Sequence, residues 1–84
     1  MYIHLGSSMA VRDSTLIGIF DLDNTTVSKH TRAFLERNQE EGQLVDVSDD
    51  IPKAFLVTSE YGLERVYLTQ MASSTLAKRA QRRK

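Results

Sequence analysis

The fold of this chain is decided by residues 54–69, which read Ala54-Phe55-Leu56-Val57-Thr58-Ser59-Glu60-Tyr61-Gly62-Leu63-Glu64-Arg65-Val66-Tyr67-Leu68-Thr69. Residues 54–58 and 65–69 are rich in β-branched and aromatic side chains, which favour strands. The segment 60–62 between them has the composition of a turn. The stretch therefore predicts two antiparallel strands. Because residues 55–57 are all apolar, the first of these strands must be covered on both faces.

Outside this pair, the sequence predicts further strands and two helices. The longer helix begins near Val27, after a segment rich in capping side chains, and ends at Glu41 with Gly42 as its left-handed terminator. A shorter helix runs from Thr75 onward, with Ser73-Ser74 as its cap. We therefore expect an α+β fold with a small, mainly antiparallel sheet, one longer helix and a short C-terminal helix. The other expected strands are 2–5, 9–11, 15–22 and 44–47.

The strand at 15–22 is also apolar on both faces. Simple alternation along a strand places Leu16, Phe20 and Leu22 on one face, and Ile17 and Ile19 on the other. The longer helix can cover only one face of the sheet, and the C-terminal helix has few apolar residues. We therefore expect a second subunit to cover the other face, so that the chain forms a homo-oligomer. The narrow apolar stripe of the longer helix is Val27, Thr31, Phe34, Leu35 and Asn38.

The 84-residue chain is long enough for one small domain, which we place at residues 1–77. It has no cysteine, which excludes disulfides and thiolate zinc sites. Its N-terminus does not have the pattern of a signal peptide, and no apolar run approaches the roughly 20 residues that span a bilayer. We therefore expect a cytoplasmic protein without a membrane partner, whose small core gains stability from oligomerisation.

Charge is distributed unevenly along the chain, although the formal net charge is zero. All 11 acidic residues lie at or before Glu64, whereas five of the 11 basic residues lie in a basic C-terminal tail, residues 78–84. Such a tail either complements the dipole of a solvated helix end or contacts an anion such as nucleic acid. The candidate nucleic-acid-binding residues, chosen by charge and expected exposure, are Arg12, Lys53, Arg65, Lys78, Arg79 and Arg82.

One motif suggests an enzyme. Residues 19–25 read Ile19-Phe20-Asp21-Leu22-Asp23-Asn24-Thr25 and resemble the first signature of the haloacid-dehalogenase phosphatases, whose first Asp attacks phosphorus. Asp46 and Asp49-Asp50 would then be the later metal ligands. Those enzymes need a parallel, doubly wound sheet, whereas the short connections here predict antiparallel pairs. We therefore expect Asp21 to end a strand and Asp23 and Asn24 to turn the chain, and we expect no catalytic residue, metal or cofactor.

Four stretches, in matching order along the chain, carry a more extensive resemblance. They are Tyr2-Ile3-His4-Leu5-Gly6, Ile17-Gly18-Ile19-Phe20-Asp21, Pro52-Lys53-Ala54-Phe55-Leu56-Val57-Thr58 and Ser73-Ser74-Thr75-Leu76-Ala77-Lys78-Arg79-Ala80. Together they resemble the RemA/RemB family of small bacterial extracellular-matrix regulators. The resemblance implies a cytoplasmic, non-enzymatic regulator of matrix (biofilm) genes. In the activator branch of that family, a small α+β fold assembles into rings that bind DNA around the outside.

The chain departs from the activator branch at two places. That branch has an arginine just before its third strand and an arginine pair in the loop before its penultimate strand. The matching positions here are Thr15 and the Asp49-Asp50-Ile51 turn, and carboxylates repel phosphate.

Two hypotheses from different classes therefore follow. The first is a homo-oligomeric, ring-forming regulator that binds double-stranded DNA or modulates a DNA-binding partner. The second is a structural or protein-interaction module whose basic tail docks on an acidic surface such as Asp46, Asp49 and Asp50.

Overall fold

The computed structural model describes residues 2–6, 9–22, 28–48 and 50–81. A short 3-10 helix, η1 (Asp13–Thr15), joins the second strand to the third. The α-helices are α1 (Lys29–Glu40) and α2 (Ser73–Gln81). The predicted α+β class is confirmed. The strands are β1 (Tyr2–Gly6), β2 (Met9–Arg12), β3 (Leu16–Asp21), β4 (Leu44–Asp46), β5 (Ala54–Glu60) and β6 (Leu63–Thr69).

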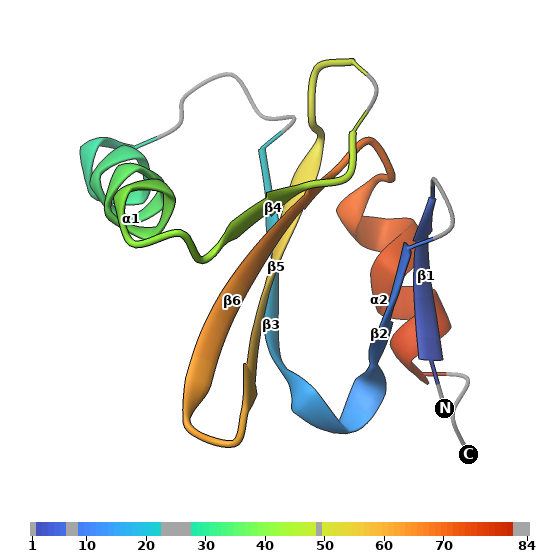
Figure 1. Cartoon of the computed structure of the whole chain (residues 1–84). Coiled ribbons are helices and arrows are strands. Elements are labelled where there is room, and N and C mark those ends of the chain that lie inside the picture. The colour runs from blue at the N-terminus through green and yellow to red at the C-terminus, as the bar shows by residue number, and fades with distance from the viewer. Residues whose placement is uncertain (1, 7–8, 23–27, 49, 82–84) are drawn as a thin grey trace.

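The elements form three layers around a four-stranded sheet of order β3-β5-β6-β4. Helix α1 lies on one side of this sheet, and the separate β1–β2 hairpin lies with α2 on the other side (Figure 1). Strand β5 pairs antiparallel with both β3 and β6. The sequence predicted a mainly antiparallel sheet, and the exception is β4, which pairs parallel with β6. The long connection through α1 returns the chain in the direction of β3, and β6 runs in that direction too, because β3 and β6 are both antiparallel to β5.

The β5–β6 hairpin closes through a two-residue turn, Tyr61-Gly62, between the paired residues Glu60 and Leu63. Both turn residues have positive φ, 54° for Tyr61 and 79° for Gly62. Two successive positive φ angles define a type I′ turn, whose twist matches that of the flanking strands. The predicted turn is confirmed, and both strands extend to it.

Helix α1 has an identifiable cap at each end. Ser28 Oγ accepts a hydrogen bond from the backbone N–H of Thr31 at 3.1 Å. At the other end, Gly42 has a φ of 74°, and the N–H of Gln43 donates to the carbonyl of Asn38 at 2.8 Å. This is the six-residue hydrogen bond of a Schellman motif. The predicted terminator at Gly42 is thus confirmed, whereas Val27 lies outside the described residues.

Helix α1 covers one face of the sheet. Phe55, Val57 and Val66 are buried there, and Phe34 and Leu35 of α1 pack against them. Asn38 is only 1% exposed, and its Nδ2 donates to the carbonyl of Phe34 at 2.9 Å. The apolar stripe predicted for this helix is confirmed for its described members.

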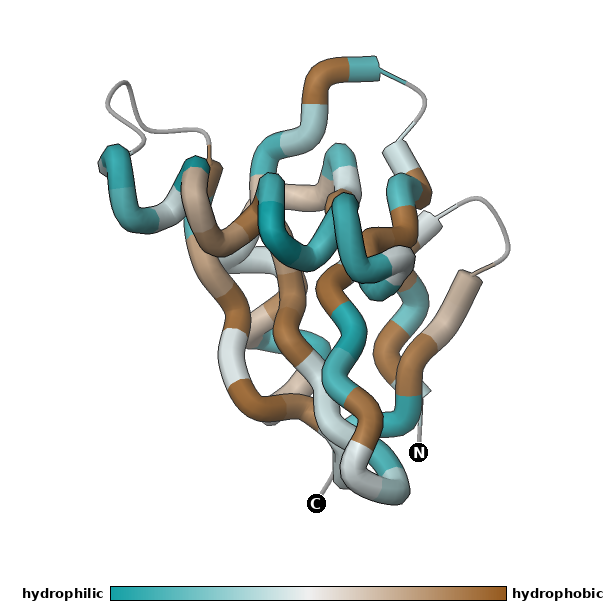
Figure 2. The backbone as a smooth tube through the Cα atoms, turned by 60° about the vertical axis from the view of Figure 1, so that its left-hand side comes forward, coloured by the Kyte–Doolittle hydropathy of each residue, from teal (hydrophilic) through white to brown (hydrophobic). Residues whose placement is uncertain are grey.

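The other face of the sheet is covered by the same chain, and the prediction of a second subunit there is wrong. Leu56 of β5 and Leu76 of α2 are both 0% exposed, and they share one core cluster with Ile3, Leu5 and Val11 of the β1–β2 hairpin. The apolar segments of the chain are concentrated along the strands, and most of the polar ones lie on helices and turns (Figure 2). The hairpin supplies the apolar area that α2 alone lacks.

The buried Thr69 fastens this second layer to the sheet. Its Oγ1 donates to the carbonyl of Leu5 at 2.8 Å and accepts from the N–H of Met71 at 3.1 Å. The first hydrogen bonds of α2 run from the N–H groups of Thr75 and Leu76 to the carbonyl of Ala72. Helix α2 therefore begins two residues earlier than predicted, and Ser73-Ser74 form its first turn rather than its cap.

Strand β3 contains a bulge that changes which side chains share a face. Leu16 pairs with Thr58 and Gly18 pairs with Val57, so Ile17 is an extra residue opposite β5. Leu16 and Ile19 consequently pack on the hairpin side, while Ile17 and Phe20 lie on the α1 side. The alternation predicted for 15–22, which separated Ile17 from Phe20, is wrong because it assumed an unbroken period of two.

Replacement of Leu76 by Ala is expected to destabilise the fold by about 2–5 kcal/mol, because it leaves a cavity between α2, the hairpin and β5. Urea unfolding followed by circular dichroism measures the loss. Lys78→Ala, an exposed position on the same helix, serves as the matched control and is expected to change stability by less than about 0.5 kcal/mol. Equal stability of the two variants would contradict the packing described here.

Candidate functional sites

The acidic residues of the phosphatase-like motif do not come together. Asp21 ends β3, and Asp46 ends β4, on opposite edges of the sheet. Three strand-to-strand steps of about 4.8 Å separate these edges. Strand β3 is antiparallel to its neighbour β5, whereas those enzymes need parallel neighbours. Among the described residues, no group of three or more His, Asp or Glu side chains could hold a metal ion. Asp23, Asn24 and Asp49 lie outside the described residues.

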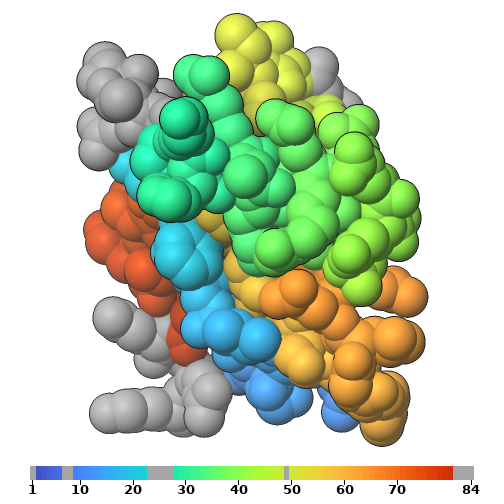
Figure 3. Space-filling model, turned by 90° about the vertical axis from the view of Figure 1, so that its left-hand side faces the viewer, coloured from blue at the N-terminus to red at the C-terminus, as the bar shows by residue number. Residues whose placement is uncertain are grey.

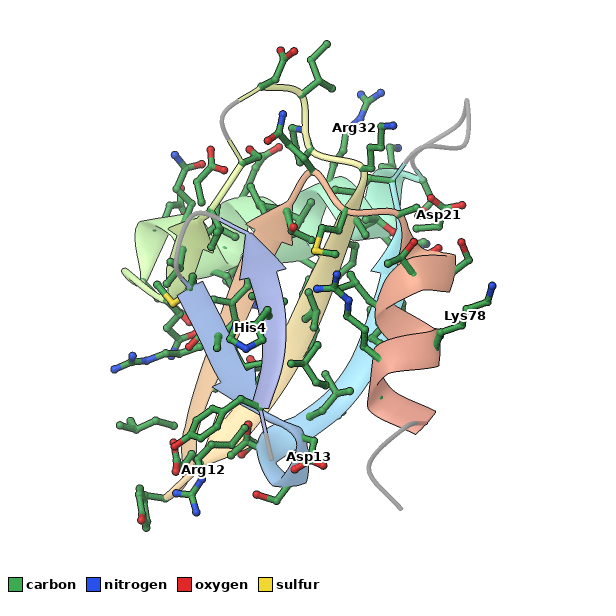
Figure 4. All side chains as sticks on the ribbon, turned by 90° about the vertical axis from the view of Figure 1, so that its right-hand side faces the viewer. His4, Arg12, Asp13, Asp21, Arg32 and Lys78 are labelled. Carbon is green, nitrogen blue, oxygen red and sulfur yellow. The ribbon has the colours of Figure 1, made fainter. Side chains whose placement is uncertain are left out.

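The candidate basic residues occupy three separate places. Arg12 and Arg65 line one pocket at the β5–β6 turn end of the sheet. Lys53 directly precedes β5 at the opposite end of this seven-residue strand, about 20 Å away. Lys78 and Arg79 lie on α2, and Lys78 projects into solvent well away from Arg12 (Figure 4). Arg82 lies outside the described residues.

Two of these cations have partners within the chain. Arg12 Nη1 lies 3.2 Å from Glu60 Oε2, with side chains 54% and 42% exposed, so the pair contributes at most about 1 kcal/mol. Arg79 Nη1 donates to the carbonyl of His4 at 3.0 Å and thereby links α2 to β1. Within the part of the chain that is described, Lys53 and Lys78 form no ion pair.

The two positions at which the chain departs from the activator branch are also placed. Thr15 ends η1, and its Oγ1 donates to the carbonyl of Arg12 at 2.7 Å. Asp50 and Ile51 are exposed in the connection between β4 and β5, with Ile51 78% exposed. Helix α2 runs away from this connection toward the opposite end of the molecule (Figure 1).

An apolar groove, which we call the β3–α1 groove, opens beside helix α1. It encloses about 330 Å³. Two of its apolar side chains are well exposed, Ile17 at 63% and Phe20 at 46%. In Figure 3, α1 covers the upper part of the sheet, and β3 with the β5–β6 hairpin shows uncovered below it. The residues lining the groove are Ile17, Phe20, His30, Thr31, Phe34, Phe55, Val57 and Glu64.

Close packing within β3 and β5 builds the floor of the groove. The Phe20 ring stacks on Phe55 with centroids 4.9 Å apart and an interplanar angle of 18°. Gly18 allows this position of the ring, since a Cβ at residue 18 would lie 2.9 Å from Phe20 Cε2. Sequence reasoning missed the groove because alternation placed Ile17 and Phe20 on opposite faces.

A second cavity, which we call the tyrosine pocket, lies on the other face of the sheet between the β1–β2 hairpin and the ends of β5 and β6. It encloses about 310 Å³. Tyr2, Tyr61 and Tyr67 line it together with Arg12 and Arg65. The sequence contained one sign of it: a bulky Tyr61 directly before Gly62, where a type I′ turn favours Asn, Asp or Gly.

Comparison with known proteins identifies the family. The model of the RemA-like family, described as extracellular matrix regulatory protein A-like, matches residues 2–80. The chain belongs to the RemA-like family. Extracellular matrix regulatory protein B of Bacillus subtilis strain 168 is 35% identical to this RemA-like chain over 81 residues, 96% of this chain and 91% of the relative. The resemblance inferred from four stretches of sequence is thereby confirmed.

One further property of this RemA-like chain concerns membranes. Neither α1 nor α2, the α-helices of the described residues, has the length and apolar character needed to cross a bilayer.

The left-handed backbone of Tyr61 generates a stability prediction. A non-glycine residue with positive φ costs about 1–2 kcal/mol, less for asparagine, which tolerates this region. Tyr61→Asn is therefore expected to raise the free energy of unfolding by about 1 kcal/mol, as measured by urea denaturation. Tyr61→Ala removes the same side chain without relieving the backbone and serves as control. An Asn variant no more stable than the Ala variant would refute the strain.

Proposed function

We propose that this RemA-like protein is a non-enzymatic, cytoplasmic regulator of extracellular-matrix genes that works as a homo-oligomer and contacts double-stranded DNA. The relationship to extracellular matrix regulatory protein B supports the regulatory role. The open β3–α1 groove supports the proposed oligomer. Ile17 and Phe20 remain exposed in it, although α1 and the hairpin layer cover the rest of the sheet. Apolar area left in a concave site is stabilised when a partner removes it from water.

The occupant we propose is Ile51 of a second copy. Ile51 is 78% exposed on the connection between β4 and β5, apart from the groove, and so forms an apolar knob. Asp50 and Lys53 lie beside Ile51. Glu64 lines the groove, and α1 exposes Lys29 and Arg32, so each surface has charges of both signs nearby. A knob of one copy in the groove of the next is a heterologous contact, and repetition of such a contact gives a ring when the rotation between copies closes.

Introduction of a charge at either surface is expected to break the assembly. Ile17→Lys and Ile51→Lys should each reduce the mass measured by multi-angle light scattering from that of more than two copies to that of one. Leu63→Lys is the matched control, because Leu63 is 58% exposed and belongs to neither surface. A monomeric wild-type protein, or an assembly that survives both variants, would refute this interface.

Tight DNA binding by this protein requires several copies of the chain in one oligomer. Among the described candidates, one copy presents Lys53, Arg65 and Lys78 as exposed cations without an ion pair at three separate places, which is too few for tight binding of a duplex. An oligomer repeats each of them, so that weak phosphate contacts add through effective concentration. Together with Arg82 they remain our candidates for this contact, whereas Arg12 already pairs with Glu60 and Arg79 with the carbonyl of His4.

DNA binding is tested by fluorescence anisotropy of a labelled duplex across a salt series. We expect affinity to fall steeply with salt, and Lys78→Gln to reduce the slope of log K against log salt by about 1 for each phosphate that Lys78 neutralises in the oligomer. A variant ending at Gln81 tests Arg82–Lys84 while keeping α2 intact. Glu36→Gln, an exposed position on α1, is the control and should change the slope little.

An alternative is an interaction module that regulates through a protein partner. The scattered positions of Arg12, Lys53 and Lys78 favour it, since they form no single positive band. A folded oligomer that binds no duplex even at low salt would establish this alternative and refute direct DNA contact.

A further inference from the structure

The tyrosine pocket concentrates one residue type. The chain contains three tyrosines, at positions 2, 61 and 67, and all three line this one cavity. They come from β1, the β5–β6 turn and β6, so the tertiary structure assembles them from distant parts of the sequence. Tyrosine offers a flat apolar ring with a polar hydroxyl at its edge. A cavity bordered by three such residues offers a surface suited to another flat ring.

Charged side chains line the same pocket, namely Arg12, Glu60 and Arg65. Arg12 is held by Glu60 at 3.2 Å, so its charge is largely balanced there. Arg65 is exposed, lines the same pocket and forms no ion pair with any described residue. The pocket therefore has one guanidinium group available for an anion beside the tyrosine rings. A guanidinium group binds carboxylate or phosphate oxygens through two parallel N–H donors.

The exposure and backbone conformation of Tyr61 independently indicate a ligand. Its side chain is 90% exposed, so packing within the chain does not require a tyrosine here. Its backbone has a φ of 54°, a region that bulky residues rarely occupy. A strained position filled by an exposed aromatic side chain, at the mouth of a cavity, is typical of a contact to something outside the chain.

We propose that the tyrosine pocket binds a small planar aromatic molecule that carries one anionic group. The aromatic ring system lies against Tyr61 and its neighbouring tyrosines, and the anion pairs with Arg65. A volume of about 310 Å³ accommodates a ligand of about the size of a mononucleotide and is too small for a stretch of duplex. Nucleotides and aromatic carboxylates share this chemistry, and the experiment separates them. Such a ligand would give the regulator a small-molecule input at a surface apart from the β3–α1 groove.

The test uses fluorine NMR of the full chain labelled with 3-fluorotyrosine. Since every tyrosine lines the pocket, all three fluorine signals report on it. We titrate with AMP, adenosine, ribose 5-phosphate and 1-naphthoate. The expected result is saturable shifts with AMP or 1-naphthoate, and at least 10-fold weaker binding of adenosine and ribose 5-phosphate, which lack one of the two features. The aromatic anion that binds more tightly shows whether the pocket prefers a nucleotide or an aromatic carboxylate.

Matched variants make the result specific. Arg65→Gln should weaken binding at least 10-fold, and Lys53→Gln, at the other end of β5, should leave it unchanged. Thermal unfolding confirms that each variant is folded. No shift with any aromatic anion at 10 mM, or shifts that Arg65→Gln does not reduce, would overturn the proposal. Light scattering and duplex binding are measured separately, so failure of the pocket is distinguishable from failure of the proposed function.

Discussion

The burial of β5 on both faces is the constraint on which the rest of this structure depends. Five consecutive residues, Ala54 to Thr58, are buried, so the sheet is unstable unless both of its faces are covered. Helix α1 covers one face and, in a chain of this size, α2 has too little apolar area to cover the other alone. The β1–β2 hairpin completes that second layer, and Thr69 fastens it by hydrogen bonds to Leu5 and Met71.

The bulge in β3 decides which of its side chains enter the core and which remain exposed, where another molecule can contact them. With Ile17 as an extra residue, Leu16 and Ile19 enter the core beneath the hairpin. The same extra residue places Ile17 beside Phe20 on the α1 side, where both stay exposed. One local irregularity therefore improves the core on one face and leaves an apolar groove on the other. Bulges often serve to redirect side chains in this way.

The alternation of β6 keeps the two candidate sites apart. Glu64 lines the β3–α1 groove, whereas Arg65 lines the tyrosine pocket on the opposite face. The self-association proposed for the groove and the ligand binding proposed for the pocket therefore depend on different side chains of one strand. In the proposed oligomer, a second copy in the groove would leave the pocket on the other face accessible. A substitution in one site therefore makes no direct contact with the other site.

The sequence by itself determined most of the fold and the family. The β5–β6 pair, the stop of α1 at Gly42 and the two-sided apolar strands follow from local propensity and periodicity, which need no partner. Four stretches in matching order were enough to identify the RemA-like family. Charge alone selected the candidate cations, but it said nothing about which of them lie together or which already have partners.

Only the tertiary structure decided what covers the second face and which side chains form the candidate sites. Periodicity assigns faces by counting residues, and the extra residue at Ile17 invalidates that count. The second face is covered by apolar side chains from both the hairpin and α2. The sequence of either segment alone does not show that together they have enough apolar area. The tyrosines at positions 2, 61 and 67 become neighbours only when the hairpin packs against the ends of β5 and β6. Segments that are far apart in the sequence become neighbours through packing, and local sequence patterns do not reveal these contacts.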